Sequence, residues 1–212
     1  MRLFSFIYTG LTIPENLWYY SDSRIIINTI YGISLMPVLH TPRLTCSPLC
    51  EADWSFFLAL QQDPDVMRYV ADNRPETAIR EAFESRLPEW TPGSAHWLCL
   101  LVRDTLSQTP LGVTGYLHHE EDIAEVGFLF APQAQGLGYG FESLKAVCDF
   151  AFNEGGIRRL TATVTAGNLP SRRLLEKQGF VLEGELRENY QLAGRWHNDW
   201  LFGLLKKEYQ QA

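Results

Sequence analysis

The segment of this sequence best suited to bind a ligand is rich in glycine. Residues 135–140 read Gln-Gly-Leu-Gly-Tyr-Gly, between an expected strand and an expected helix. Glycine lets a backbone approach a ligand closely, and the first turn of a helix presents free N–H groups and a positive dipole end. The segment therefore suits an anion such as a diphosphate, or it is a plain flexible turn. A P-loop and a Rossmann turn are both excluded, because Gly-Lys-Ser/Thr is absent and the third glycine is wrongly spaced.

A second motif follows downstream. It reads Asn168-Leu169-Pro170-Ser171 and continues as a helix that ends in Gly179-Phe180. Together with residues 135–140, it resembles the GNAT superfamily of acyl-CoA-dependent N-acetyltransferases, whose signatures are Gln/Arg-x-x-Gly-x-Gly/Ala and Asn-x-x-Ser/Ala. The resemblance covers about residues 39–208.

Three shorter segments refine this resemblance. They are Thr41-Pro42-Arg43-Leu44, Ala124-Glu125-Val126-Gly127-Phe128 and Glu183-Gly184. They look like the branch that includes the ribosomal-protein N-terminal (serine/alanine) acetyltransferases.

The resemblance implies a site for acetyl-CoA as cosubstrate. In the family, a splayed strand pairs with the pantetheine arm, the glycine loop binds the diphosphate, and the helix Asn approaches the pantetheine. Arg172 or Arg173 is expected at a CoA phosphate, or on a solvated helix face. The implied acetyl-CoA contacts are Phe128, Leu129, Phe130, Gln135, Gly136, Leu137, Gly138, Tyr139, Gly140, Asn168, Ser171 and Arg172.

The chemistry requires a base, because an amine is mostly protonated at neutral pH and must lose a proton before it attacks a thioester. Glu125 is the leading candidate, since a carboxylate partly desolvated beside the pantetheine strand would be a stronger base. A solvent-facing or ion-paired Glu125 is the alternative, with His118 and His119 as further bases.

The departing thiolate requires a proton donor. Many family members carry a Tyr seven residues after the helix Asn, but position 175 is leucine here. Ser171 is therefore the expected catalytic acid, although a serine in a first helical turn also serves as a cap. Tyr190 is a second candidate, with a packed aromatic as its alternative role. No covalent intermediate is required, and Cys148 is expected in the core.

The order of the expected elements that position these residues predicts an α+β fold. The expected elements, in order, are a strand at 39–46, a helix from 48 to 64, a helix from 75 to 87, strands at 97–102, 111–117 and 123–130, a helix at 141–153, a strand at 160–165, a helix at 169–178, and strands at 180–189 and 196–205. This order predicts a mixed, mostly antiparallel sheet of six to seven strands flanked by helices, with splayed central strands.

Length and composition agree with one enzyme domain. The chain has 212 residues, 46% of them hydrophobic, and a formal charge of −7. We expect a single domain at 37–212 after an extension or misplaced start at 1–36. The acidic balance argues against direct nucleic-acid binding, and no apolar run is long enough to span a membrane. Four scattered cysteines predict a reducing, cytoplasmic location, and their spacing predicts no metal site.

The sequence thus predicts an acetyl-CoA-dependent N-acetyltransferase that transfers acetyl directly to a primary amine. The N-terminal α-amine of a protein, such as a ribosomal protein, is the first acceptor considered. A small amine (a polyamine, an amino acid or an aminoglycoside) and a non-catalytic CoA-binding module are the alternatives. The aromatic closing strands would support a homodimer.

Overall fold

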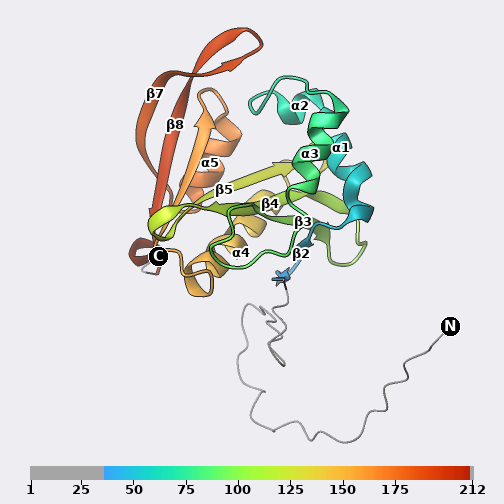
Figure 1. Ribbon diagram of the computed structural model, residues 1–212. Helices are drawn as coiled ribbons and strands as arrows, with labels where there is room; N and C mark the ends of the chain where they lie inside the picture. Colours follow the sequence, from blue (N-terminus) through green and yellow to red (C-terminus); the bar gives the residue numbers. More distant parts are fainter. Residues whose placement is uncertain (1–35, 211–212) are drawn as a thin grey trace, which may run out of the picture.

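The computed structural model describes residues 36–210, and within them an eight-stranded sheet forms the centre of the protein (Figure 1). The predicted N-terminal extension lies outside the described residues, except for Met36. The strands are β1 (Leu39–His40), β2 (Leu44–Pro48), β3 (Leu98–Asp104), β4 (Pro110–His118), β5 (Ile123–Phe130), β6 (Arg159–Thr165), β7 (Val181–Leu192) and β8 (Arg195–Leu205).

The strand order is β1-β2-β3-β4-β5-β6-β8-β7, and only the β5–β6 pair is parallel. The expected α+β fold with a mixed, mostly antiparallel sheet is confirmed. A parallel pair requires a crossover, and the helix between β5 and β6 provides it.

The strand count differs from the expected six to seven because the strand expected at 39–46 is divided. A turn at Thr41–Arg43 reverses the chain, so that Leu39 pairs with Cys46. The Thr41 N–H donates to the Leu44 carbonyl, and the Leu44 N–H donates to Thr41 Oγ1, both at 2.9 Å. Pro42 in the middle of this turn cannot continue a strand ladder.

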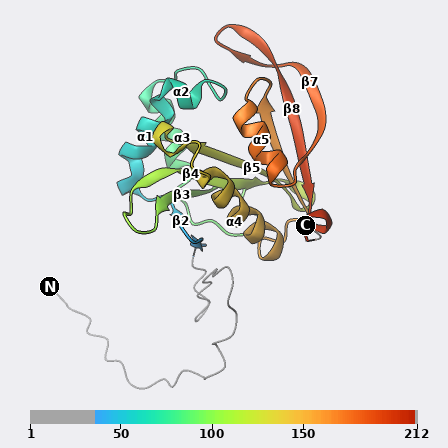
Figure 2. The ribbon, with the colours of Figure 1, turned by 180° about the vertical axis from the view of Figure 1, so that it is seen from behind.

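The helices cover both faces of the sheet (Figures 1 and 2). They are α1 (Trp54–Gln62), α2 (Pro64–Met67), α3 (Glu76–Glu84), α4 (Tyr139–Asn153), α5 (Leu169–Lys177) and α6 (Lys206–Tyr209), with short 3-10 turns at Glu51–Asp53, Glu120–Asp122 and Pro132–Ala134. The expected helix from 75 to 87 ends earlier, at Glu84, and the helix expected at 141 begins at Tyr139.

Two hydrophobic clusters divide the core between these faces. On β3, Leu98, Leu100 and Val102 pack in the cluster that contains α4 and Leu175 of α5, whereas Leu101 packs with Phe57 and the other residues of α1–α3. Successive strand side chains point to opposite faces, so one apolar strand supplies both clusters. Cys148 is fully buried in the α4 cluster, as expected.

Among residues 36–210, no helix combines the length and the apolar character needed to cross a lipid bilayer.

Candidate active site

The parallel strands β5 and β6 separate partway along their length. Their pairing starts at Ile123 opposite Arg159 and ends at Glu125 opposite Thr161, although β5 continues to Phe130 and β6 to Thr165. The backbone of β5 beyond Glu125 therefore has a free edge on the β6 side. The predicted splay of the central strands is confirmed, and it opens the sheet where the candidate residues lie.

A groove of about 670 Å³ runs along this free edge to the glycine loop and α5. Its lining includes Phe128, Leu129 and Phe130 of β5, Gln135, Gly136, Gly138 and Gly140 of the loop, and Asn168 and Ser171 of α5. Three cations, Arg68, Arg173 and Lys177, line the same groove. The groove thus joins an open strand edge, a helix N-terminus and positive side chains, which together suit an elongated ligand with phosphate groups.

The backbone at the start of α4 explains the glycines of the loop. Gly138 is the N-cap with φ +84, a left-handed conformation that side-chain-bearing residues adopt poorly. A Cβ placed there would lie 3.3 Å from Nη2 of Arg43. The amides of the first helical turn have no intrahelical acceptor, so they are free to bind an anion. At Gly138 this cradle of backbone amides therefore tolerates little added bulk, whereas a Cβ at Gly136 would meet nothing within 4 Å.

Two side chains hold this cradle in place. Gln135 Nε2 donates to the Phe130 carbonyl at 2.9 Å, which ties the loop to the end of β5. Arg43 Nη1 donates to the Leu137 carbonyl at 3.1 Å, and its guanidinium lies 4.5 Å from the Tyr139 ring centroid. Leu137 and Tyr139 are not among the described residues that line the groove, and their contact with acetyl-CoA stays a prediction.

Arg172 is not among the residues that line the groove. Its Nε donates to Glu176 at 2.8 Å, and its guanidinium lies 5.0 Å from the Trp200 ring centroid, on another face of α5 from the groove. Successive helical residues are about 100° apart, so the neighbouring Arg173 faces the groove instead. Arg173 was the other option that the sequence left open.

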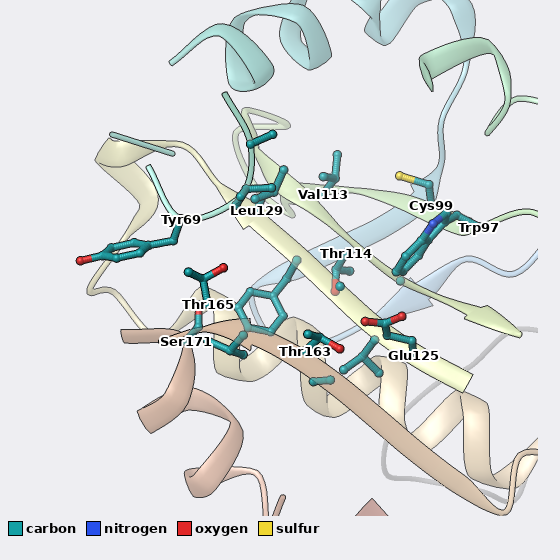
Figure 3. Close-up of a pocket in the computed structure, with 18 of the residues that line it drawn as sticks. Tyr69, Trp97, Cys99, Val113, Thr114, Glu125, Leu129, Thr163, Thr165 and Ser171 are labelled. Carbon is teal, nitrogen blue, oxygen red and sulfur yellow. The ribbon is translucent and has the colours of Figure 1, made fainter. Parts of the chain in front are cut away.

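A second cavity, of about 530 Å³, lies on the side of the sheet that α1–α3 cover (Figure 3). Glu125, Ser171 and Tyr190, the three predicted catalytic residues, all line it. They come from β5, α5 and β7, which are far apart in the sequence. The fold therefore brings the three candidates to one space.

The two cavities share a wall at the splay. The residues that line both are Tyr69, Val70, Phe128, Leu129, Asn168 and Ser171. A ligand in the groove and a ligand in the second cavity would therefore meet at this point.

Glu125 projects into the second cavity beneath the Trp97 ring (Figure 3). Its Oε2 lies 3.6 Å from Nε2 of His119, whose side chain is 46% exposed. This contact links the carboxylate to a group open to solvent. His118, the other histidine considered, has its Nε2 buried without a hydrogen-bond partner among the described residues.

Ser171 lies in the first turn of α5, whose N-cap is Asn168. The Asn168 side chain accepts a hydrogen bond from the Ser171 N–H at 3.3 Å, so this asparagine fixes the start of the helix. Ser171 lines both cavities. Leu175, one turn later, is fully buried and also lines the second cavity.

The Tyr190 hydroxyl donates to the Val70 carbonyl at 3.0 Å. A second bond connects the same elements, from the Ala193 N–H to Asp72 Oδ1 at 2.7 Å. The β7–β8 hairpin thus reaches across to the chain after α2 and closes one side of the second cavity. The hydroxyl proton of Tyr190 is donated to the Val70 carbonyl, so Tyr190 is placed to hold the β7–β8 hairpin against the chain after α2.

Sequence reasoning missed several residues of the second cavity. Trp97, Cys99, Arg74 and Arg86 line it, and none was a candidate. Trp97, directly before β3, and Cys99 within it are two residues apart, a spacing that is a signal for a shared face. Burial raises the pKa of the Cys99 thiol to about 12, so it stays protonated at neutral pH. In the part of the chain that the structure describes, no group of three or more His, Cys, Asp or Glu side chains is arranged to hold a metal ion.

Comparison with known proteins defines the class. Residues 43–181 match the family described as "Acetyltransferase (GNAT) domain", which makes this protein an acetyltransferase. The chain belongs to the GNAT acetyltransferase family, and its curated homologues are N-acetyltransferases.

Three similar proteins illustrate the range. The uncharacterized N-acetyltransferase p20 of Bacillus licheniformis is 28% identical over 179 residues, which cover 82% of this chain and 99% of p20. The putative ribosomal N-acetyltransferase YdaF of Bacillus subtilis is 29% identical over 97 residues, 44% of this chain and 53% of YdaF. The spermidine N-acetyltransferase of Vibrio cholerae, solved with CoA and spermine, has a TM-score of 0.71 at 21% identity and covers 80% of this chain and 99% of its own. At this identity, the last likeness shows the fold alone.

Proposed function

We propose that this acetyltransferase moves the acetyl group of acetyl-CoA directly to a primary amine. The observation that carries the proposal is the wall shared by the groove and the second cavity, because it allows donor and acceptor to be held together. Holding two reactants side by side lowers the entropic part of the barrier. No residue of the protein then needs to carry the acetyl group.

The residues of the groove fit acetyl-CoA, which supplies its acetyl group as a thioester. The free edge of β5 offers backbone partners to the pantetheine, as an added strand would have. The loop amides and the side chains of Arg68, Arg173 and Lys177 offer partners to the phosphates.

Glu125 is proposed to take the proton that the attacking amine must lose. It lines the cavity of the acceptor and lies at the last paired position before the splay. His119, at 3.6 Å and half exposed, is placed to pass this proton to solvent. A base positioned in this way contributes about 10²–10⁴-fold to the rate.

Ser171 is proposed to protonate the departing sulfur. Ser171 lines both cavities, and the position that carries Tyr in many relatives is the buried Leu175. Tyr190 is the weaker candidate because its proton is donated to Val70.

Among the acceptors considered, a small amine fits the second cavity better than the N-terminus of a folded protein. The hydrogen bonds from Tyr190 to Val70 and from Ala193 to Asp72 close the space that a protein chain would occupy. The similarity to YdaF supports the protein acceptor, but it covers less than half of this chain. The cytoplasmic location and the homodimer stay predictions.

The test is release of free CoA thiol by the full chain with acetyl-CoA and three acceptor groups: peptides with free α-amines, polyamines and aminoglycosides, and amino acids. We expect turnover with a small amine, and initial-rate plots that intersect when both substrates are varied. Turnover with peptides alone would instead support the N-terminal α-amine of a protein as the acceptor. Binding of acetyl-CoA with no turnover for any amine would instead favour a non-catalytic module.

A further inference from the structure

The charged groups of the second cavity are separated by sign. The lining contains four charged side chains, of which Glu125 and Asp199 come from the strands β5 and β8. Arg74 and Arg86 come from the segments before and after α3, on the opposite wall. The cavity therefore has an acidic wall formed by the sheet and a basic wall formed by the segments that flank α3.

The positive charges of Arg74 and Arg86 on the basic wall are not neutralised by a described carboxylate. Arg74 Nη2 donates to Gln61 Oε1 at 2.5 Å, and Arg86 donates to the Ala82 carbonyl and to Ser85 Oγ. All of these acceptors are uncharged. Within residues 36–210, neither guanidinium has a carboxylate partner within 4.0 Å.

Both arginines are half-buried, which makes the missing counter-charge costly. Burial lowers the pKa of Arg86, and the nearby positive charge of Arg74 acts in the same direction. Two like charges held together at a cavity wall are stabilised when an anion lies between or against them. By contrast, Arg80 of α3 is paired with Glu51 and Glu84.

The floor of the cavity sets the distance between the two walls. Cys99, Gly115 and Gly127 lie side by side on β3, β4 and β5, and the Arg86 side chain reaches Cys99. Gly115 has φ +153, and a Cβ there would lie 1.7 Å from the Leu98 carbonyl oxygen, so only glycine fits. Cys99 and β5 are two strand spacings apart, roughly 10 Å. The Trp97 ring lies over Gly127, 3.1 Å from where a Cβ would be.

We propose that the acceptor of this enzyme is an amine that also carries an anionic group such as a carboxylate, with the amine at Glu125 and the anion at Arg74 and Arg86. This inference rests on the proposed function and narrows its acceptor. It argues against a polyamine, because a second ammonium group would face the two guanidinium groups.

Matched acceptors test the proposal. The full chain is assayed by thiol release with ω-amino carboxylates, α,ω-diamines and 1-alkylamines over the same series of chain lengths. We expect kcat/KM for the best amino carboxylate to exceed that for the diamine of equal length by about 10- to 100-fold, as charged hydrogen bonds allow. Equal or better use of the diamines would overturn the proposal.

Variants locate the effect at the basic wall. Arg86→Gln and Arg74→Gln should each lower kcat/KM for the amino carboxylate about tenfold or more, and change that for the alkylamine by less than about twofold. Arg80→Gln, on α3 but outside the cavity lining, is the matched control and should change neither. Equal losses with both acceptors would contradict an anion site. If Arg86→Gln does not fold, Arg74→Gln and the acceptor series on the native chain still decide.

A binding measurement separates this inference from the proposed function. Saturation-transfer NMR of the full chain with hexanoate, and with 1-hexanol as the uncharged control, requires no turnover. We expect a hexanoate signal that Arg74→Gln weakens and Arg80→Gln preserves. Hexanoate binding without acetyl transfer would refute the proposed function alone, whereas transfer without preference for carboxylates would refute the anion site alone.

Discussion

Arg43 donates two hydrogen bonds to Glu142, which lies 99 positions later in the sequence. Arg43 Nε is 2.7 Å from Glu142 Oε2, and the Arg43 backbone N is 2.9 Å from Glu142 Oε1. Thr41 Oγ1 donates to the same Oε1 at 2.6 Å. The turn between β1 and β2 is thereby fixed to the first turn of α4, beside the glycine loop. The Thr41-Pro42-Arg43 segment thus supports the candidate CoA groove, a role that the sequence resemblance did not assign to it.

The first prediction concerns the pH dependence of this contact. Partial burial works to raise the pKa of Glu142, but the hydrogen bonds from Thr41 and Arg43 outweigh it and lower that pKa from its ordinary value of 4.5. A carboxyl whose pKa is lower in the folded state stabilises the fold above its unfolded-state pKa and loses that contribution as the pH falls. The difference in urea midpoint between the native chain and Glu142→Gln should therefore be largest near neutral pH and shrink below about pH 4.5.

Glu176→Gln is the control for that comparison. Glu176 pairs with Arg172 one helical turn away and is exposed, so its removal should change the urea midpoint little. A Glu142→Gln difference that persisted unchanged at acid pH would show that the loss is one of packing and not of charge.

The second prediction concerns the glycine cradle. Gly138→Ala should weaken CoA binding by about tenfold or more, because the added Cβ meets Arg43 in the loop that the proposal assigns to the diphosphate. Isothermal titration with CoA measures the change. Gly156→Ala is the matched control, since Gly156 has a similar φ of +72 but meets nothing within 4 Å. Equal CoA affinity in the two variants would show that the loop is not part of the CoA-binding site.

The third prediction separates the base from the binding machinery. Glu125→Gln should lower kcat by about 10²–10⁴-fold, because the amide cannot accept the amine proton, and leave the CoA dissociation constant within about twofold. Stopped assays at several pH values supply kcat and its pH profile. Glu120→Gln, an exposed neighbour in the turn before β5, should have the activity of the native chain. A Glu125→Gln enzyme with native turnover would leave His119 as the base.

The fourth prediction distinguishes Ser171 from Tyr190. Ser171→Ala should lower kcat by about tenfold or more, with a smaller change in KM for the amine, because the lost hydroxyl acts on the leaving sulfur. Tyr190→Phe removes the bond to Val70 and should raise that KM more than it lowers kcat. The reverse pattern, with kcat lost mainly in Tyr190→Phe, would make Tyr190 the proton donor.

The sequence predicted the features that depend on local spacing. Alternating apolar residues gave β3 to β6, and the glycines at 136, 138 and 140 marked the loop before α4. The positions of Glu125 and Ser171 beside the splay came from family resemblance and not from periodicity. Their roles stay predictions, while their meeting in one cavity is a property of the fold.

The parts that were missed depend on helix phase and on tertiary placement. Arg172 and Arg173 are adjacent in sequence, and only the packing of α5 decides which one faces the groove. Arg74 and Arg86 flank α3 and resemble ordinary surface charges, because nothing near them in the sequence indicates that they line a cavity. Similarly, the first strand is divided at Pro42. The Leu44 N–H donates a hydrogen bond to Thr41 Oγ1 and closes the turn, and periodicity does not encode this contact.

The wall between the two cavities also has a consequence for inhibition. Tyr69, Phe128 and Ser171 line both spaces, so a single covalent molecule with CoA at one end and an amino carboxylate at the other would pass between the two spaces at these residues. Such a molecule loses its translational freedom once, where two separate ligands lose it twice, and its second half binds at the effective concentration set by the linker. Because the fold brings the two substrates together, it should also bind a single molecule in which they are joined.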